Sequence, residues 1–315
     1  VPGWGTPPER ATIGVINPLA RQSAHMQDGG DRAEEIRVLS YNVYYAGIES
    51  TPEWSWDRRR ESVASTLRFH RPDVVALQEV WQDQLPDLRE RLDGYDWYGE
   101  RAAGGEHTPV GYRRDRFERE GAGVFALSET PEELGSVDWG GRYPRFATHV
   151  RLTDRVTGTT LLVVSTHLDH ESEDARGAAA RLLVDWLTGA EDTTLNGVVE
   201  EGPTTPIEAV DAVALAGDFN CTPGSDPYDH LTSAAPLADA RTVAASQHHG
   251  PAVTYAGTAP DDPDQVPKRI DHVFVTPTVD VVRTGVCADT DADGQHPSDH
   301  LPVVADFTPG TAGES

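Results

Sequence analysis

Residues 162–167 read L-V-V-S-T-H, a strand-like run of aliphatic and β-branched residues that ends in a histidine. The apolar runs at 38–42, 74–79 and 215–220 also end in polar residues, and S-D-H at 298–300 precedes a further run. A strand holds its terminal side chain rigidly. Carboxylates, amides and imidazoles are the groups that hard cations and phosphates require. Five such segments therefore predict a preorganised site at one edge of a β-sandwich.

Alternating apolar runs and turn signals predict many short strands with a few helices. One helix is expected from Trp56 to the residue before Pro72, because Val63 and Leu67 recur on one face, and a second at about 174–187. Residues 188–206 are expected to form a surface loop. The pattern indicates two packed sheets with helices outside them. Strands are expected at 36–42, 73–79, 121–127, 146–152, 160–167, 210–217, 269–275 and 301–307.

Length and composition favour one catalytic domain. The chain has 315 residues, of which 37% are hydrophobic, enough for a substantial core. We assign this domain to residues 34–310 and a short tail to 311–315. Residues 1–33 lack sustained periodicity and contain the only methionine, Met26. We expect this segment to be disordered. Its alternative origins are a tag, sequence upstream of a start at Met26, or a native N-terminal arm.

The charge balance is strongly acidic. The chain carries 52 acidic and 26 basic residues, a net charge of −26, and Lys268 is its only lysine. Self-repulsion of this size destabilises a compact state in dilute buffer, but strong salt screens it, because the Debye length falls to about 3 Å at 1 M. We therefore expect a halophilic protein from the cytoplasm of a haloarchaeal cell. An acidic surface evolved for solubility alone is the alternative, and it leaves the missing lysines unexplained.

Membrane and disulfide signals are weak in this sequence. No apolar stretch approaches the roughly 20 residues of a membrane span, and no charged segment precedes an apolar run at the N-terminus. Cys221 and Cys287 are the only cysteines, too few for a disulfide framework and without metal-ligand spacing. We interpret both as buried apolar residues and expect a soluble, monomeric, cytoplasmic protein without membrane partners.

Seven motifs follow one another in a defined order. They are S-Y-N-V at 40–43, W-D-R-R at 56–59, P-D-V-V-A-L-Q-E-V at 72–80, S-T-H-L-D-H at 165–170, G-D-F-N at 217–220, R-I-D-H at 269–272 and S-D-H-L-P-V at 298–303. Together they resemble the endonuclease/exonuclease/phosphatase superfamily, which includes deoxyribonuclease I and exonuclease III. The resemblance covers about residues 36–307. It implies an α+β fold, a four-layered two-sheet β-sandwich flanked by α-helices, and a metal-dependent phosphoric ester hydrolase.

The resemblance also implies metal and water-binding residues. Glu79 and Asp299, with Asn42 beside them, are expected to bind the divalent ion, and oxygen-only ligands suit Mg²⁺ or Mn²⁺ rather than zinc. Asp218 is expected to act as the base or to orient the attacking water. Asn220 is expected to hold a phosphate oxygen or to position that water.

Two histidines complete the implied catalytic set. His300 is expected to donate to the phosphate as charge develops, with Asp271 fixing its tautomer and raising its pKa. His167 is expected to make a second phosphate contact and to be oriented by Glu106. Both pairs are predicted to lie within hydrogen-bond distance, and both histidines are predicted to face one metal pocket.

Further polar residues lie within or near these motifs. Arg59 resembles a family position whose guanidinium braces the strands of the active site. Arg145 is either a clamp for the substrate phosphate or part of a surface ion pair. Asp169 and His170 adjoin His167; we favour a structural role in which Asp169 bonds loop amides over a further metal site.

These observations favour a Mg²⁺-dependent phosphodiesterase or nuclease that acts on small or single-stranded substrates. A phosphomonoesterase on small phosphorylated metabolites is the second hypothesis. The sequence shows no long basic stripe, so duplex DNA is the least supported nucleic acid. A catalytically inactive binding module would be expected to lack one of five residues, all of which are present: Glu79, Asp218, Asn220, Asp299 and His300.

Overall fold

The computed structural model describes residues 33–46, 52–81, 83–99, 106–190, 207, 209–259, 262–263 and 265–310. From Glu34 onwards the chain forms one compact unit. The expected N-terminal segment, apart from Ala33, and the expected tail at 311–315 lie outside the described residues. Residues 191–206 of the expected surface loop also lie outside the described residues.

The first sheet has six strands in the order β11-β12-β1-β2-β4-β3. At its centre β1 and β2 run parallel, with Asn42 opposite Gln78, and the remaining neighbours pair antiparallel. The strands are β1 (Ile36–Asn42), β2 (Val74–Gln78), β3 (Tyr95–Tyr98), β4 (Val110–Arg113), β11 (Val279–Val286) and β12 (Val303–Pro309).

The second sheet also has six strands, in the order β5-β6-β7-β8-β10-β9. Here β7 and β8 form the parallel pair, with His167 opposite Asp218, and β10 lies antiparallel to β8 with Asp271 opposite Asp218. The strands are β5 (Phe117–Ala126), β6 (Phe146–Asp154), β7 (Thr160–His167), β8 (Ala212–Asp218), β9 (Ala238–Asp239) and β10 (Asp271–Val275).

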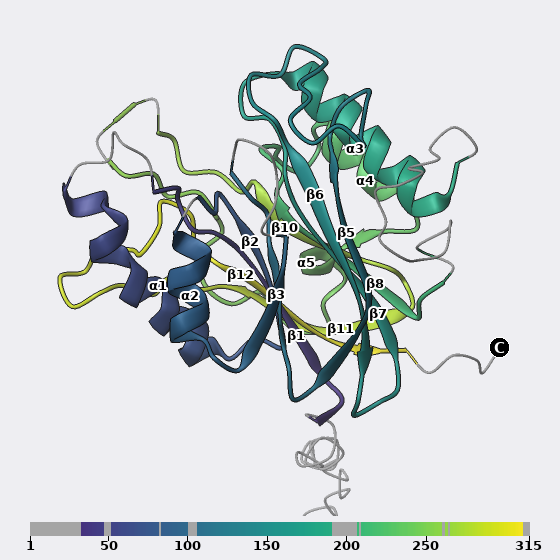
Figure 1. Cartoon of the computed structure of the whole chain (residues 1–315), viewed down its shortest axis with the longest axis horizontal. Helices are drawn as coiled ribbons and strands as arrows, with labels where there is room; N and C mark the ends of the chain where they lie inside the picture. The colour runs from purple at the N-terminus through teal and green to yellow at the C-terminus, as the bar shows by residue number, and fades with distance from the viewer. Residues whose placement is uncertain are drawn as a thin grey trace, which may run out of the picture. The chain divides into compact units, whose positions relative to one another are not determined.

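Helices cover the outer faces of both sheets. The helical segments are η3 (Pro52–Trp54), α1 (Trp56–His70), α2 (Gln84–Arg91), α3 (Glu173–Thr188), α4 (Asp226–Ser233) and α5 (Ala240–Val243). Figure 1 shows α1 and α2 on one side of the sheets and α3 and α4 on the other. The protein is therefore a four-layered α+β sandwich, as the sequence predicts.

Alternation along the central strands builds three apolar cores. In β7, Leu161 and Val163 face the core between the sheets, whereas Leu162 and Val164 face the core under α3. In β1, Val38 faces the inner core and Leu39 packs under α1 and α2. Because these strands are buried on both faces, they appear in the sequence as unbroken apolar runs, which explains why their ends were visible as motifs.

The eight expected strands and both expected helices are present, with bounds shifted by a few residues. The sequence analysis did not identify β3, β4, β9, β11, α2, α4 or α5. These are short or lie at sheet edges, where one exposed face weakens the apolar pattern. For example, β11 carries Asp280 and Arg283 and forms the edge of its sheet beside β12.

Both cysteines are free thiols, as expected; Cys221 is buried and Cys287 is only partly buried. Within the described residues, no helix has the length and apolar character needed to cross a bilayer.

Candidate active site

The polar strand ends of both sheets meet at one place. Asn42 ends β1 in the first sheet, and Asp218 ends β8 in the second. The amide nitrogen of Asn42 donates to Glu79 Oε1 at 2.9 Å and to Asp218 Oδ2 at 3.0 Å. Parallel neighbours place their carboxyl ends at the same edge of a sheet, so the two parallel pairs deliver their terminal side chains to one shared site.

The close approach of β7 and β8 requires a glycine before Asp218. A Cβ atom at Gly217 would lie 2.1 Å from the carbonyl oxygen of Thr166, a separation that backbone atoms cannot tolerate. Glycine therefore lets β8 pack tightly against β7 and fixes the position of the next side chain. The local sequence G-D-F-N is thus explained by packing at its first residue and by polar contacts at its second and fourth.

Asp218 lies between two histidines. Its Oδ2 is 3.4 Å from Nε2 of His167 and 3.6 Å from Nε2 of His300. Its Oδ1 accepts from the backbone N–H of Asn220 at 2.9 Å. All three side chains are buried. The structure therefore brings both histidines to the same carboxylate.

His300 is held as a cation by carboxylates. Its Nδ1 donates to Asp271 Oδ2 at 2.9 Å. Burial lowers the pKa of His300, but the charges of Asp271, Asp218 and Asp299 more than offset burial and raise it well above its usual value. Asp271 is fixed in turn, because its backbone N–H donates to the hydroxyl of Thr254. Thr254 was not identified from the sequence, where nothing distinguishes it from a loop threonine.

His167 is held in the neutral form. The Asn220 side-chain amide donates to Leu168 O at 3.0 Å, and its nitrogen lies 3.0 Å from His167 Nε2. On the other side of the ring, Nδ1 lies 2.9 Å from Glu106 Oε1. Burial, together with the nearby guanidinium of Arg145, lowers the pKa of His167 to about 3. The surroundings of these two buried histidines thus displace their pKa values in opposite directions.

Arg145 is buried beside His167, so it is not the surface ion pair that the sequence analysis considered. It forms an ion pair with Glu106, and its Nη1 lies 2.8 Å from His167 Nδ1. Its Nη2 donates to His170 Nδ1 at 3.0 Å. Asp169 accepts from the backbone N–H groups of Glu171, Ser172 and Arg142, the structural role that the sequence favours.

Glu79 and Asp299 are the candidate metal ligands. Glu79 has a left-handed backbone, with φ of 57°, and its Oε2 accepts from the N–H of Tyr45. A non-glycine residue in this region is strained, a feature that clusters at functional sites. Burial, opposed by the charge of His300 and assisted by that of Glu79, raises the pKa of Asp299 to about 6. Carboxylate oxygens are the donors that a hard divalent cation prefers, which makes both residues candidate ligands.

Asn42 presents its nitrogen, not its oxygen, to the two carboxylates. Its Oδ1 instead accepts from the backbone N–H of Tyr44 at 3.0 Å. This orientation was not foreseen when Asn42 was expected to stand beside the metal. It supports a positioning role in which the amide holds Glu79 and Asp218 in place.

Arg59 joins the helix α1 to two active-site segments. Its guanidinium donates to the carbonyls of Val43 and Pro297 at 2.8 and 2.9 Å, and to those of Tyr44 and Trp54, both at 2.8 Å. Val43 follows Asn42, and Pro297 precedes the Ser298-Asp299-His300 segment. Ser298 closes the link by donating to the carbonyl of Asn42 at 2.7 Å. Arg59 therefore links α1 to the segments that carry Asn42 and Asp299.

This set of groups can support attack on a phosphorus centre. It combines a carboxylate that can accept a proton, a histidine whose protonated form is favoured, a second histidine whose neutral form is favoured, an amide and two carboxylates that are candidate metal ligands. Within the described residues, ligand atoms of Glu79, His167 and Asp218 lie within 4.8 Å of one another, as do those of Asp218, Asp271 and His300.

The sequence and the fold are similar to known proteins. Residues 39–300 match the model of the endonuclease/exonuclease/phosphatase family. Among curated proteins, the 3'-5'-exoribonuclease subunit Ccr4 of the CCR4-Not complex from Emericella nidulans is 24% identical over 252 residues. The matched region covers 64% of this chain but 37% of that protein, so the chain spans little more than a third of this relative.

Solved structures are similar over most of this chain. An endonuclease/exonuclease/phosphatase from Bacteroides vulgatus is 29% identical with a TM-score of 0.76, covering 87% of this chain and 99% of that one. A mannosyl-6-phosphatase from Bacteroides thetaiotaomicron is 29% identical with a TM-score of 0.73, at the same coverage.

Proposed function

The chain belongs to the endonuclease/exonuclease/phosphatase family of metal-dependent phosphoester hydrolases, and on this premise we propose that it is a Mg²⁺-dependent phosphodiesterase for small or single-stranded substrates. The observation that carries the proposal is the position of Asp218 between a charged His300 and a neutral His167. A proton acceptor flanked by one cationic donor and one neutral imidazole suits attack by water on an anionic phosphoester.

Glu79 and Asp299 would hold the divalent ion, for which Mn²⁺ is the expected substitute for Mg²⁺. Both present only carboxylate oxygens, and their mutual repulsion is relieved by a cation. When bound, such an ion lowers the pKa of water and neutralises charge that develops on the phosphate. Asn42 holds the carboxylates of Glu79 and Asp218 in place by donating one N–H to each.

The protein side chains have separate tasks in the reaction. Asp218 accepts the proton of the attacking water or orients that water, and Asn220 keeps Asp218 in place through its backbone N–H. His300 donates from Nε2 to a phosphate oxygen, while Asp271 holds its Nδ1 proton. His167 makes a second contact to the phosphate, and the Glu106–Arg145 pair fixes its ring.

Charge balance at the site favours a substrate with one negative charge. The positive charges are those of His300, Arg59 and Arg145, together with the divalent ion, and they face six carboxylates: Glu79, Glu106, Asp169, Asp218, Asp271 and Asp299. A phosphodiester adds one negative charge to this set, whereas a phosphomonoester adds up to two. Arg145 is already paired with Glu106, which reduces its attraction for a second phosphate charge.

A phosphomonoesterase is the second candidate, because the similar structure from Bacteroides thetaiotaomicron is a mannosyl-6-phosphatase. A sugar phosphate is small and lacks the extended contacts that a polynucleotide needs. It is therefore compatible with an enzyme whose net charge of −26 repels polyanions.

The two candidates are separated by one set of assays in strong salt with Mg²⁺. We expect kcat/KM for bis(p-nitrophenyl) phosphate, or for a short single-stranded oligonucleotide, to exceed that for p-nitrophenyl phosphate and mannose 6-phosphate by at least about tenfold. The reverse order would assign the enzyme to phosphomonoesters. Asp218→Asn is the control in each assay, since activity that survives this change comes from a contaminant or from another site.

A further inference from the structure

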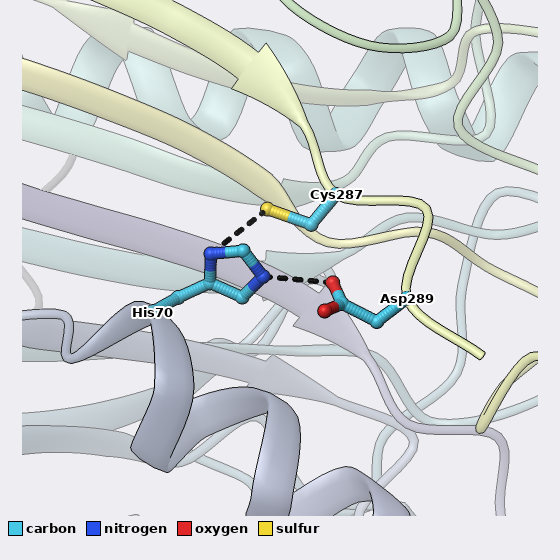
Figure 2. A group of neighbouring side chains, drawn as sticks. All are labelled: His70, Cys287 and Asp289. Atoms are coloured by element: carbon cyan, nitrogen blue, oxygen red, sulfur yellow. Dashed lines mark hydrogen bonds and ion pairs between the residues drawn. The ribbon is translucent and has the colours of Figure 1, made fainter. Parts of the chain in front are cut away.

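A second group of metal-capable side chains lies away from the proposed active site. His70 is the last residue of α1, and Cys287 and Asp289 follow β11. Figure 2 shows the imidazole of His70 between the other two side chains. Arg59, which braces the active site, lies eleven residues earlier in α1, so about 16 Å of helix separates the two regions. The reaction proposed above uses none of these three residues.

The carboxylate of Asp289 fixes the imidazole of His70. His70 Nε2 lies 2.7 Å from Asp289 Oδ2, to which it donates. In the neutral ring the other nitrogen, Nδ1, then carries a lone pair, and it faces Cys287 Sγ at 3.7 Å. Histidines that bind metals commonly donate their second N–H to a carboxylate in this manner.

The distance between sulfur and nitrogen fits a shared cation. With Zn–S near 2.3 Å and Zn–N near 2.1 Å, two ligands of a tetrahedral zinc ion are separated by about 3.6 Å. The observed 3.7 Å between Cys287 Sγ and His70 Nδ1 is close to that separation. One ligand atom from each of the three residues lies within 4.8 Å of those of the other two.

The same three groups resemble the relay of a reactive thiol, but the surrounding charge opposes that function. Burial raises the pKa of the Cys287 thiol to about 12, and the carboxylates of Asp289 and Asp306 raise it against the opposing charge of Arg37. A thiol nucleophile needs an electropositive setting that favours the thiolate. A negative setting instead attracts a cation, which displaces the thiol proton on binding.

Charge neutrality also favours a divalent ion at this position. Arg37 donates from Nε and Nη2 to the two oxygens of Asp306, at 2.7 Å each, so that pair is balanced. A Cys287 thiolate and the Asp289 carboxylate then leave two negative charges. His70 and Asp289 side chains are 21% and 30% exposed, which leaves a route for an ion from solvent.

We propose that Cys287 Sγ and His70 Nδ1 bind a thiophilic divalent cation of the Zn²⁺ class, with Asp289 orienting the imidazole and supplying the second negative charge. Water completes the coordination. The bound ion joins the end of α1 to the segment 287–302. The two ends of this segment are hydrogen-bonded to each other, because the Cys287 N–H donates to Pro302 O at 2.9 Å. That segment contains Asp299 and His300, so the ion stabilises the part of the chain that carries them.

Cobalt offers a readout that does not depend on catalysis. The full chain, freed of metal and kept in excess Mg²⁺ to fill oxygen sites, is titrated with Co²⁺ and then with Zn²⁺. We expect a thiolate-to-cobalt charge-transfer absorption that saturates at one ion per chain and disappears as Zn²⁺ displaces Co²⁺. The proposed active site has no cysteine ligand and cannot give this signal.

Matched variants identify the ligands. Cys287→Ser should abolish the absorption, whereas Cys221→Ser, which changes the only other thiol, should retain it. Asp289→Asn should weaken the affinity for Co²⁺ by at least about tenfold. Absence of the absorption in the unchanged protein, or its persistence in Cys287→Ser, would overturn the proposal. An unaltered affinity in Asp289→Asn would overturn the role of Asp289.

A second measurement needs no variant and therefore does not depend on the folding of Cys287→Ser. In the unchanged protein, saturating Zn²⁺ should slow alkylation of Cys287 by iodoacetamide at least about tenfold, measured by mass spectrometry of the modified peptides. Alkylation of Cys287 at the same rate with and without Zn²⁺ would contradict metal binding by its sulfur.

Discussion

Nδ1 of His300 lies 2.9 Å from Oδ2 of Asp271, and this contact sets the charge of the histidine that faces the proposed substrate. Burial alone lowers the pKa of His300, so its net rise depends on Asp271 and on the carboxylates of Asp218 and Asp299. The contact joins β10 to the segment before β12, two elements that are adjacent only in the folded protein.

The first prediction concerns Asp271→Asn. Without the Asp271 charge, the pKa of His300 falls, so the proton needed for donation is lost at lower pH. We expect the alkaline limb of the kcat/KM profile to move to lower pH and turnover near neutral pH to fall about 10²-fold. The measurement is a pH–rate profile of both proteins, with circular dichroism as the control for folding. An unshifted alkaline limb would show that His300 is not the essential acid.

The second prediction concerns the groups in contact with substrate and metal. Asp218→Asn, His300→Ala and Glu79→Gln should each lower kcat by at least about 10², because each removes a group required in the transition state. Asp229→Asn, which changes an exposed carboxylate on α4, should leave kcat unchanged. EDTA should abolish activity, and Mg²⁺ or Mn²⁺ should restore it. A variant that folds normally and keeps wild-type turnover would exclude its residue from the mechanism.

The third prediction concerns Arg59. Replacement by alanine leaves four carbonyls without their charged donor, so we expect a loss of about 3 kcal/mol in the free energy of unfolding. Because two of those carbonyls flank Asn42 and the Asp299 segment, kcat should also fall, by about 10²-fold. Urea unfolding and steady-state kinetics measure the two effects.

The control for Arg59 is its neighbour Arg58, whose side chain forms an exposed ion pair with Asp293. Arg58→Ala should change stability by no more than about 0.5 kcal/mol. If Arg59→Ala unfolded more easily but kept wild-type kcat, the residue would support the fold without setting the geometry of the site.

The fourth prediction concerns His149, which is buried against the rings of Phe125 and Trp186. Burial lowers its pKa to about 4, from a usual value of 6.5. Below about pH 6.5 the unfolded chain therefore binds a proton that the folded protein does not, and stability falls as pH decreases towards 4. From about pH 7.5 to pH 5 this residue should remove about 2 kcal/mol.

His149→Phe keeps an aromatic ring in place and removes the titrating group. Its free energy of unfolding should therefore fall by about 2 kcal/mol less than that of the wild type over the same pH change. Urea unfolding at both pH values, at constant salt, measures the difference. Parallel losses in the two proteins would show that His149 does not contribute to acid sensitivity.

The fifth prediction concerns salt. A net charge of −26 should destabilise the protein in dilute buffer, and screening should relieve this repulsion. We expect the thermal midpoint and turnover to rise as KCl increases from about 0.1 to 3 M, since buried contacts at the metal are little screened. Maxima at the low end, with a steady decline above it, would refute the halophilic interpretation.

Much of the sandwich was predictable because its central strands are buried on both faces. The runs that became β1, β2, β7 and β8 are continuous and apolar, and each leads into a polar residue. The strands that the sequence analysis did not identify lack this signal. Gly111 in β4 packs against the ring of Trp97 in β3, an arrangement that depends on a partner strand and leaves no periodic pattern in either segment.

The contacts around the histidines were only partly predictable. The Asp271–His300 distance agrees with expectation, because both residues lie in recognisable motifs. The Glu106–His167 distance also agrees with the contact that the family resemblance implied. The burial of Arg145 beside Glu106 was not predictable, since a charged residue in a polar segment gives no sign of its depth. The orientation of the Asn42 amide depends on the backbone of Tyr44, which the sequence does not specify.

The sequence by itself determined the family, the order of the strands that carry polar ends, and the chemical types of the site residues. These depend on local composition and on alternation along single strands. The tertiary structure alone decided which charges face one another, because charge states depend on burial and on neighbours from distant segments. His167 and His300 illustrate this, since two imidazoles in one pocket have pKa values displaced in opposite directions. The cluster of His70, Cys287 and Asp289 is a second example. The histidine and the cysteine are 217 positions apart, so no spacing pattern in the sequence reveals the cluster. Only the packing of α1 beside the end of β11 brings the sulfur and the nitrogen together.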